Sequence, residues 1–103
     1  NKIKRTYFNV TLKDGTALQV KMPTKNKFGK VQALNRLQQD ENADVGDVID
    51  TMAGVMADCL SNNLNGTKVS AEQIADDYDI EEMTAFIAEY YEKFVGGIQN
   101  NPN

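Results

Sequence analysis

The stretch from Asp79 to Ile98 reads DIEEMTAFIAEYYEKFVGGI, and it decides the fold of the chain. Its apolar residues recur at steps of three and four, which is the period of one face of an α-helix. Asp79 can cap this helix, and Glu82 three residues later completes a capping box. We expect the apolar face either to form the core alone or also to offer its aromatic rings to a partner. The face consists of Ile80, Met83, Phe86, Ile87, Tyr90, Tyr91, Phe94, Val95 and Ile98.

Length and composition restrict the functions open to this chain. Its 103 residues give room for a single domain, 1–103, with one modest core. The chain has no histidine, the commonest general base and metal ligand, and its one cysteine cannot form an internal disulfide. No apolar run approaches the length that spans a membrane. We therefore expect a non-enzymatic protein of a reducing cytoplasm, with no catalytic residue, no cofactor, no metal site and no membrane contact.

Charge is distributed unevenly along the chain. Residues 1–30 carry eight basic side chains and one acidic one, whereas residues 31–103 carry three basic and fourteen acidic ones. The expected organisation is therefore a basic β-hairpin and loop (1–30), an acidic helical part (31–99) and a polar tail (100–103). Opposite charges on two parts of one molecule attract, within a copy or between copies, so we expect self-association.

Residues 3–22 are predicted to form a β-hairpin. A two-residue Asp14-Gly15 loop would place the apolar residues of the two strands on opposite faces, which a core does not tolerate. A three-residue loop with Gly15 in a left-handed conformation and a G1 bulge places them on one face, and it pairs Val10 with Leu18. We predict this second register. Both edges of the hairpin start unpaired, so the hairpin has to pack on the helices or pair with more strands. Its apolar face is Phe8, Val10, Leu12, Leu18, Val20 and Met22.

The fold class that follows is α+β, an N-terminal hairpin at about 3–22 followed by a mainly α-helical part of about four helices. After a basic loop, Thr24–Lys30, we expect a short helix at Val31–Gln39 and a polar connection at Asp40–Ala43. A long helix capped by Asp44 runs to about Asn62, and its apolar stripe is Val45, Val48, Ile49, Met52, Val55, Met56, Cys59 and Leu60. After a turn at Asn63–Val69, a short helix at Ala71–Asp77 is capped by Ser70.

Three site-like patterns have simpler structural explanations. Ser61, Asn63, Asn65, Gly66 and Glu72 match the spacing of an EF-hand calcium loop, but Glu72 is their single carboxylate, so we favour an ordinary Asn-Gly turn. The acidic cluster Asp76–Glu82 straddles a helix start, where carboxylates serve as caps. Cys59 lies on an apolar stripe and is expected to be an inert core thiol.

The segment from Asp44 to Ile98 resembles the small tail assembly chaperones of long-tailed bacteriophages and their prophages. The resemblance is carried by MADCLSNN (Met56–Asn63), GTKVSAE (Gly66–Glu72), YDIEEM (Tyr78–Met83) and EYYEKF (Glu89–Phe94). It implies a non-enzymatic protein in the cytoplasm of a host bacterium. The expected partners are the tape measure protein, the tail tube protein and further copies of the chain, and the expected role is to promote polymerisation of the tail tube.

Grooves that accept amphipathic helices are commonly lined by methionine and aromatic side chains. The partner-binding candidates are therefore Met52, Met56, Tyr90, Tyr91 and Phe94, with Phe86 favoured as a core residue. Tyr90 and Tyr91 point in adjacent directions, so we expect that one of them stays partly exposed. An alternative function is that of a small nucleic-acid-associated regulatory protein using the basic hairpin. The acidic remainder of the chain argues against it, because it would repel phosphates.

Overall fold

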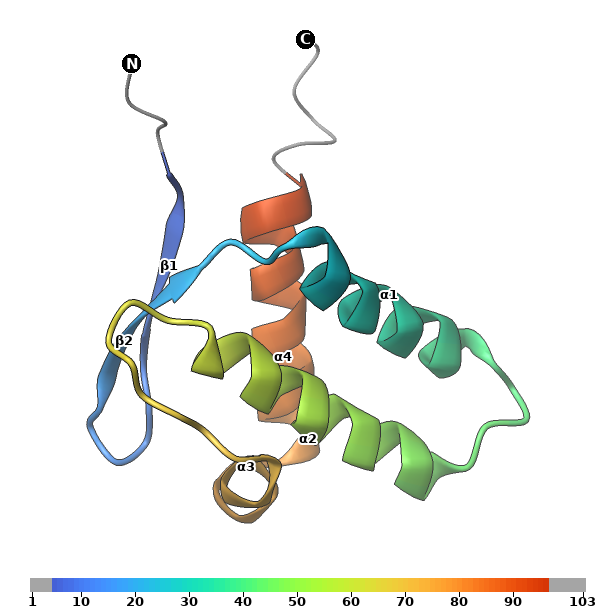
Figure 1. Ribbon diagram of the computed structural model, residues 1–103. Coiled ribbons are helices and arrows are strands. Elements are labelled where there is room, and N and C mark those ends of the chain that lie inside the picture. Colours follow the sequence, from blue (N-terminus) through green and yellow to red (C-terminus); the bar gives the residue numbers. More distant parts are fainter. Residues whose placement is uncertain (1–4, 97–103) are drawn as a thin grey trace, which may run out of the picture.

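The computed structural model describes residues 5–96, and within them it shows an α+β fold, as the sequence predicts. The elements are β1 (Tyr7–Thr11), β2 (Ala17–Lys21), α1 (Lys25–Gln39), α2 (Val45–Ser61), α3 (Ala71–Asp77), α4 (Ile80–Tyr91) and a π-helical turn, η1 (Glu92–Gly96). Figure 1 shows α1 and α2 side by side, with α4 crossing them and the hairpin at one end. Predictions for residues 1–4 and 97–103, including Ile98, and for the side chain of Val95 lie outside the described residues.

The hairpin has the register that the three-residue loop predicts. Gly15 has a φ of +92°, which glycine adopts without strain. The Leu12 N–H donates to the Thr16 carbonyl at 2.8 Å, and the Gly15 N–H donates to the Leu12 carbonyl at 2.9 Å. The cross-strand pairs are Tyr7 with Lys21, Phe8 with Val20, Asn9 with Gln19, Val10 with Leu18 and Thr11 with Ala17.

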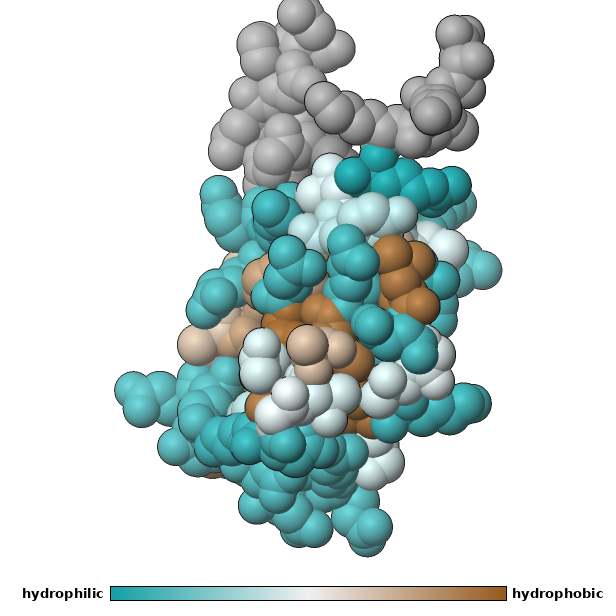
Figure 2. Space-filling view, turned by 90° about the vertical axis from the view of Figure 1, so that its left-hand side faces the viewer, coloured by the Kyte–Doolittle hydropathy of each residue, from teal (hydrophilic) through white to brown (hydrophobic). Residues whose placement is uncertain are grey.

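The apolar face of the hairpin packs on the helices, with one exception. Leu12, Leu18 and Val20 are buried, but Met22 is 43% exposed, so its predicted place on this face is wrong. Strand β2 ends at Lys21 and Pro23 follows, so the alternation of the strand does not continue to Met22. Figure 2 shows the side of the molecule that carries the hairpin: hydrophobic residues gather in its middle, and hydrophilic residues surround them.

The outer edge of β2, which starts unpaired within the hairpin itself, is paired with a distant turn. The Lys21 N–H donates to the Asn62 carbonyl at 2.8 Å, and the Leu64 N–H donates to the Gln19 carbonyl at 3.0 Å. The side chain of Asn65 accepts a further bond from the Gln19 N–H. The turn after α2 therefore covers an edge that would otherwise be open to another strand.

Helix α1 begins at Lys25, earlier than the predicted Val31, so the predicted basic loop is wrong. Thr24 caps it, because its hydroxyl accepts a hydrogen bond from the Lys27 N–H at 3.3 Å. Phe28 extends the apolar stripe of Val31 by one turn and packs against the core. The lysines of the predicted loop therefore lie on a helix.

The other helix starts agree with the sequence. Asp44, Ser70 and Asp79 each accept a hydrogen bond from the N–H three residues later. At α4 the predicted capping box is complete, since the Asp79 N–H donates back to the Glu82 carboxylate at 2.9 Å. Each cap satisfies a backbone donor that has no partner within its own helix.

Two predicted core positions at helix starts are exposed instead. Val45 is 70% exposed and Ile80 is 51% exposed, and each is the first residue of its helix. The core lies further along, where α1, α3 and α4 all pack against α2. The largest fully buried side chains are Tyr90, Phe94, Leu34, Leu60, Ile74, Val20 and Val31.

Candidate partner-binding groove

Four of the five partner-binding candidates lie in the core. Met52, Met56, Tyr90 and Phe94 are between 1% and 3% exposed, so none of them is an accessible contact residue in this conformation. Periodicity identified the apolar faces of α2 and α4 but not how completely neighbouring elements cover them. These four residues are therefore core residues and not partner contacts.

An aromatic cluster explains why the second half of α4 is so deeply buried. The ring of Tyr90 lies 5.0 Å from that of Phe94 and 5.9 Å from that of Phe86, centroid to centroid. From the hairpin, Phe8 contributes a ring 5.8 Å from Phe86 and 6.4 Å from Phe94. The tilted and edge-on pairs among them suit the quadrupoles of aromatic rings, and Phe8 stacks on Phe86 at an interplanar angle of 29°. The aromatic residues of α4 therefore hold the hairpin, and Phe86 is a core residue as favoured from the sequence.

Burial also makes the polar groups beside this cluster unreactive. Burial raises the pKa of the Cys59 thiol to about 11, although the neighbouring Tyr90 hydroxyl opposes that shift. The pKa of Tyr90 is raised as well, first by burial and then by the nearby thiol. A buried thiol that stays protonated is not a nucleophile, so Cys59 has the expected character of a core residue.

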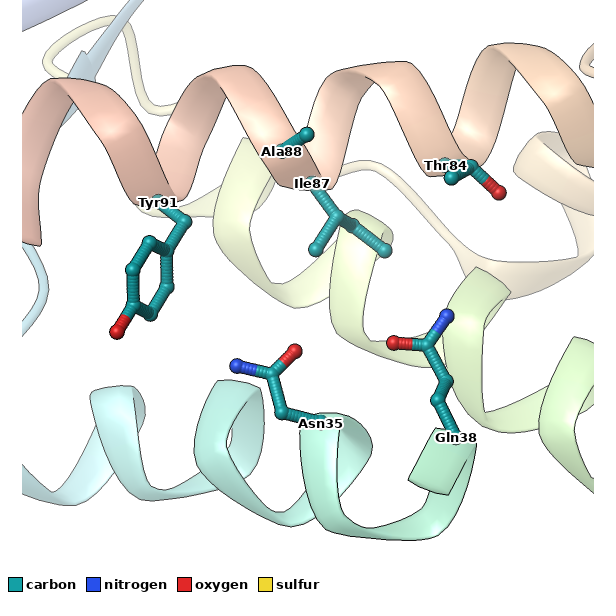
Figure 3. A pocket seen from close by; sticks show the side chains of 6 residues that line it. All are labelled: Asn35, Gln38, Thr84, Ile87, Ala88 and Tyr91. Atoms are coloured by element: carbon teal, nitrogen blue, oxygen red, sulfur yellow. The ribbon is translucent and has the colours of Figure 1, made fainter. Parts of the chain in front are cut away.

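Tyr91 is the one candidate that keeps part of its ring exposed, as predicted for one member of the Tyr90–Tyr91 pair. Its ring centroid lies 6.1 Å from that of Phe28 on α1. The two helices both pack against α2, and a groove of about 280 Å³ separates them. Figure 3 shows that Asn35 and Gln38 line it from α1, and Thr84, Ile87, Ala88 and Tyr91 from α4.

The chemistry of this α1–α4 groove suits packing rather than catalysis. Its lining contains two amides, one hydroxyl, one phenol and two aliphatic side chains, and none of the six residues is acidic, basic or a cysteine. The volume is at the lower limit for a small-molecule site, which typically measures about 300–1,000 Å³. An open groove of this kind is better matched to protein side chains.

The two helices that line the groove carry opposite charge, although none of the lining residues is charged. Helix α1 contains Lys25, Lys27, Lys30 and Arg36 and has no acidic residue. Helix α4 contains Glu81, Glu82 and Glu89 and has no basic residue. The described residues form two ion pairs, Lys13–Glu82 at 2.8 Å and Lys30–Asp58 at 3.4 Å. The first pair joins the hairpin to α4 and the second joins α1 to α2, so neither of them connects α1 with α4.

The segment with EF-hand-like spacing is a hydrogen-bonded turn. The Asn63 amide donates to the carbonyls of Leu60 and Thr67 at 2.7 and 2.8 Å, and its oxygen accepts from the N–H groups of Asn65 and Thr67. The Ser61 hydroxyl both donates to and accepts from the backbone of Val69. These oxygens bind the chain itself. Among residues 5–96, no group of three or more His, Cys, Asp or Glu side chains is placed to hold a metal ion.

Sequence reasoning missed the structural role of Asn63, which is the one buried polar residue among those whose burial the structure describes. The string SNNLNG contained the signal, since asparagine readily bonds to the backbone of a turn.

None of the helices described in residues 5–96 combines the length and apolarity needed to cross a membrane. No protein-family model, no curated protein and no solved structure matches this chain.

Proposed function

We propose that this protein is a tail assembly chaperone of a long-tailed bacteriophage or prophage. In this role it binds the tape measure protein in the cytoplasm of the host bacterium and promotes polymerisation of the tail tube around it. It acts by association alone and performs no chemical step.

The observation that carries the proposal is the family-like pattern between Met56 and Met83. Its residues build one structural unit, the corner at which α2 passes through a turn into α3 and then into α4. Asn63 and Ser61 lock the turn through backbone bonds, and Ser70 and Asp79 cap the two helices that follow. A pattern concentrated in caps and turn residues favours a shared architecture over chance similarity in composition.

Physical properties of the chain support the same role. A tape measure protein is long and helical, so its apolar stripes need cover before the tail tube encloses it. Helix-in-groove docking provides such cover, because an amphipathic helix lays its apolar face between two others. The α1–α4 groove offers Ala88 and the exposed part of Tyr91 for this purpose, beside the largely buried Ile87. The net charge of −4 favours solubility of the chaperone.

Co-expression tests the proposal. The gene neighbourhood should contain a tail tube gene upstream and a very long gene for a helical protein downstream. A fragment of that long protein, produced alone in bacteria, is expected to be mostly insoluble, and production with this chain should move it into the soluble fraction. An unchanged soluble fraction at matched expression would oppose the proposal.

One observation favours a second candidate function, nucleic-acid binding. The predicted basic loop is part of α1, whose cations lie together on one helix without an acidic residue. Lys27 and Lys68 also line a polar cavity of about 520 Å³, although Asp58 lines it too. Binding through these lysines would weaken steeply with salt, since phosphate contacts release counterions. Affinity for a random duplex that falls as salt rises and is lost in Lys27→Glu would favour this candidate.

A further inference from the structure

We propose that the outer edge of β1, the edge that does not pair with β2, binds an extended segment of another protein as an additional antiparallel strand. The segment carries a lysine or arginine at the position that faces a cavity beside Phe8. This inference goes beyond the proposed function and does not rest on the phage role, because it concerns a strand edge and not the α1–α4 groove.

The backbone of β1 has unpaired hydrogen-bonding groups along this edge. The Leu12 N–H donates to the Thr16 carbonyl, so the backbone groups of Leu12 point toward β2. Because this direction alternates along an antiparallel strand, every second residue before Leu12 also points toward β2, and the residues between them point away. No backbone group of the residues that point away has a hydrogen-bond partner among the described residues. These residues are Tyr7, Asn9 and Thr11.

Strand β1 also lacks the features that usually protect an open edge. Its sequence, YFNVT, contains no charged residue and no proline, and its pairing with β2 is continuous, without a bulge. The outer edge of β2 is different, because the turn after α2 lies along it (Figure 1). Of the two outer edges in the described sheet, that of β1 is therefore the one that can accept a strand.

The side chains of β1 that face the helices are less buried than their partners on β2. Val20 and Leu18 are 0% and 3% exposed, whereas Phe8 and Val10, which pair with them, stay partly exposed. All four side chains lie on the same face of the hairpin. The difference follows from position, since β2 has a neighbour on both sides and β1 has one on a single side. A further strand would cover the exposed parts of Phe8 and Val10.

A cavity of about 370 Å³ lies beside Phe8 on the open side of β1. Besides Phe8, residues at the end of α4 and in η1 line it, and no residue of β2 does. In an added antiparallel strand, the residue opposite Phe8 points to the same face of the sheet as Phe8. Its side chain would therefore enter this cavity. The lining residues from α4 and η1 are Ala88, Glu89, Glu92 and Lys93.

The charges of the cavity lining determine which side chain fits. Glu89 and Glu92 provide two carboxylates against the single ammonium of Lys93, and none of the three takes part in an ion pair among the described residues. The alkyl stem of a lysine or arginine would pack on Phe8, and its cation would meet the two carboxylates. Val10 does not line the cavity, so an apolar β-branched residue suits the position opposite it.

A second copy of the described strand fits this site less well. The β2 edge of that copy is already occupied, so its β1 would have to provide the pairing. Antiparallel pairing of the two edges would place Thr6, Phe8 or Val10 of the second copy opposite Phe8, and none of these residues is basic. The two α4 helices would also lie on the same face of the joined sheet, with acidic residues on both, and like charges oppose docking.

Amide hydrogen exchange followed by NMR tests the edge. In the free chain, the amides of Asn9 and Thr11 should exchange at least about tenfold faster than that of Val10, which bonds to β2. The probe is a heptapeptide with blocked ends, Thr-Val-Thr-Lys-Thr-Val-Thr, whose lysine is opposite Phe8 when the strand is added. At saturation this lysine peptide should slow exchange of the Asn9 and Thr11 amides at least about tenfold.

The backbone of the peptide provides a matched control that leaves the protein unchanged. In antiparallel pairing, the N–H groups of the threonines beside the lysine point toward β1, whereas the N–H of the lysine points away. N-methylation of one of these threonines should weaken binding at least about tenfold, because it removes a hydrogen bond at the edge. N-methylation of the lysine should weaken binding less than about twofold.

Charge changes in the peptide and in the protein test the cavity. A peptide with glutamate in place of the lysine should bind at least about fivefold more weakly. Glu89→Lys should weaken binding of the lysine peptide about fivefold, because Glu89 lines the cavity. Glu81→Lys makes the same charge change at an exposed position of α4 outside the cavity, and it should alter binding less than about twofold. Circular dichroism confirms that both variants remain folded.

Four results would overturn the inference. Slow exchange of the Asn9 and Thr11 amides in the free monomer would mean that the chain covers its own edge. Protection that rises with protein concentration, without peptide, would assign the edge to a second copy. Equal affinities for the lysine and glutamate peptides, or equal effects of the two N-methyl groups, would remove the cavity or the strand pairing from the account. Binding of the peptide as predicted, without binding of a tape measure fragment, would leave the inference standing while the phage role fails.

Discussion

The rings of Phe8 and Phe86 stack at 5.8 Å between centroids, and this contact joins the hairpin to α4. Phe86→Ala should lower the free energy of unfolding by about 3–5 kcal/mol, because it leaves a cavity beside Phe8 and Tyr90. A double-mutant cycle with Phe8→Ala should give a coupling of about 0.5–1.5 kcal/mol for the ring pair. Urea denaturation measures both values. An unchanged midpoint in Phe86→Ala would show that this side chain is not in the core.

Substitutions at Gly15 and Gly29 should change the stability of the protein in opposite directions, although both glycines have open surroundings. A Cβ atom would meet no other atom within 4 Å at either position, but Gly15 alone of the two has a positive φ. Gly15→Val should therefore destabilise the protein by roughly 1–2 kcal/mol through backbone strain. Gly29→Ala, inside α1, should stabilise it by up to about 1 kcal/mol through helix propensity. Urea denaturation measures both changes in the free energy of unfolding. If both substitutions stabilise the protein, or both destabilise it, the hairpin register or the early start of α1 is wrong.

The ion pair between Lys13 and Glu82 predicts a pH dependence of stability. The hydrogen bond from Lys13, together with one from the Asp79 N–H, holds the pKa of Glu82 below its ordinary value of 4.5. A carboxylate whose pKa is lowered by folding stabilises the native state above its unfolded pKa, and this contribution is lost as the pH falls through the folded pKa.

Glu82→Gln should therefore be less stable than the wild type at neutral pH, and the difference should shrink toward zero as the pH falls through the folded pKa of Glu82. Chemical denaturation across this pH range measures it. Glu81→Gln is the matched control, since Glu81 is exposed and outside both ion pairs. A difference that stays constant from neutral to acidic pH would mean that the charge of Glu82 is irrelevant to stability.

The Cys59 thiol should react as a buried group. With a pKa of about 11 in the folded protein, it is thiolate to about one part in a thousand at pH 8. Alkylation followed by mass spectrometry should proceed at least about a hundredfold more slowly in the native protein than in denaturant. Similar rates under the two conditions would place Cys59 at the surface and call the packing of α2 against α4 into question.

Local signals in the sequence predicted the parts of the fold that depend on a few neighbouring residues. Gly15 selected the hairpin register because a single loop length places the apolar residues on one face. Asp44, Ser70 and Asp79 marked helix starts because each has a side chain that bonds to the backbone N–H three residues later. Tyr90 and Tyr91 point in different directions, so the expectation that one of them stays partly exposed was confirmed.

The missed features depend on residues that are distant in the sequence. The edge of β2 pairs with a turn more than forty residues later, and no local pattern indicates this pairing. Met52 and Met56 have the side-chain types of a binding groove, but α1, α3 and α4 together cover the helix that carries them. The start of α1 was missed because its first turn is almost entirely polar, with Phe28 as its first large apolar side chain. The α1–α4 groove itself arises from how two helices sit on a third.

Sedimentation velocity of this chain mixed with a tape measure fragment tests the central claim, that the protein binds and coats a long helical partner. The fragment comes from the long gene expected beside that of the chain, and it is labelled so that its own boundary can be followed. We predict that the fragment sediments faster in the presence of the chain and that several copies bind to each fragment. A fragment that sediments at the same rate with and without excess chain, at low salt and with both components soluble, would contradict the claim.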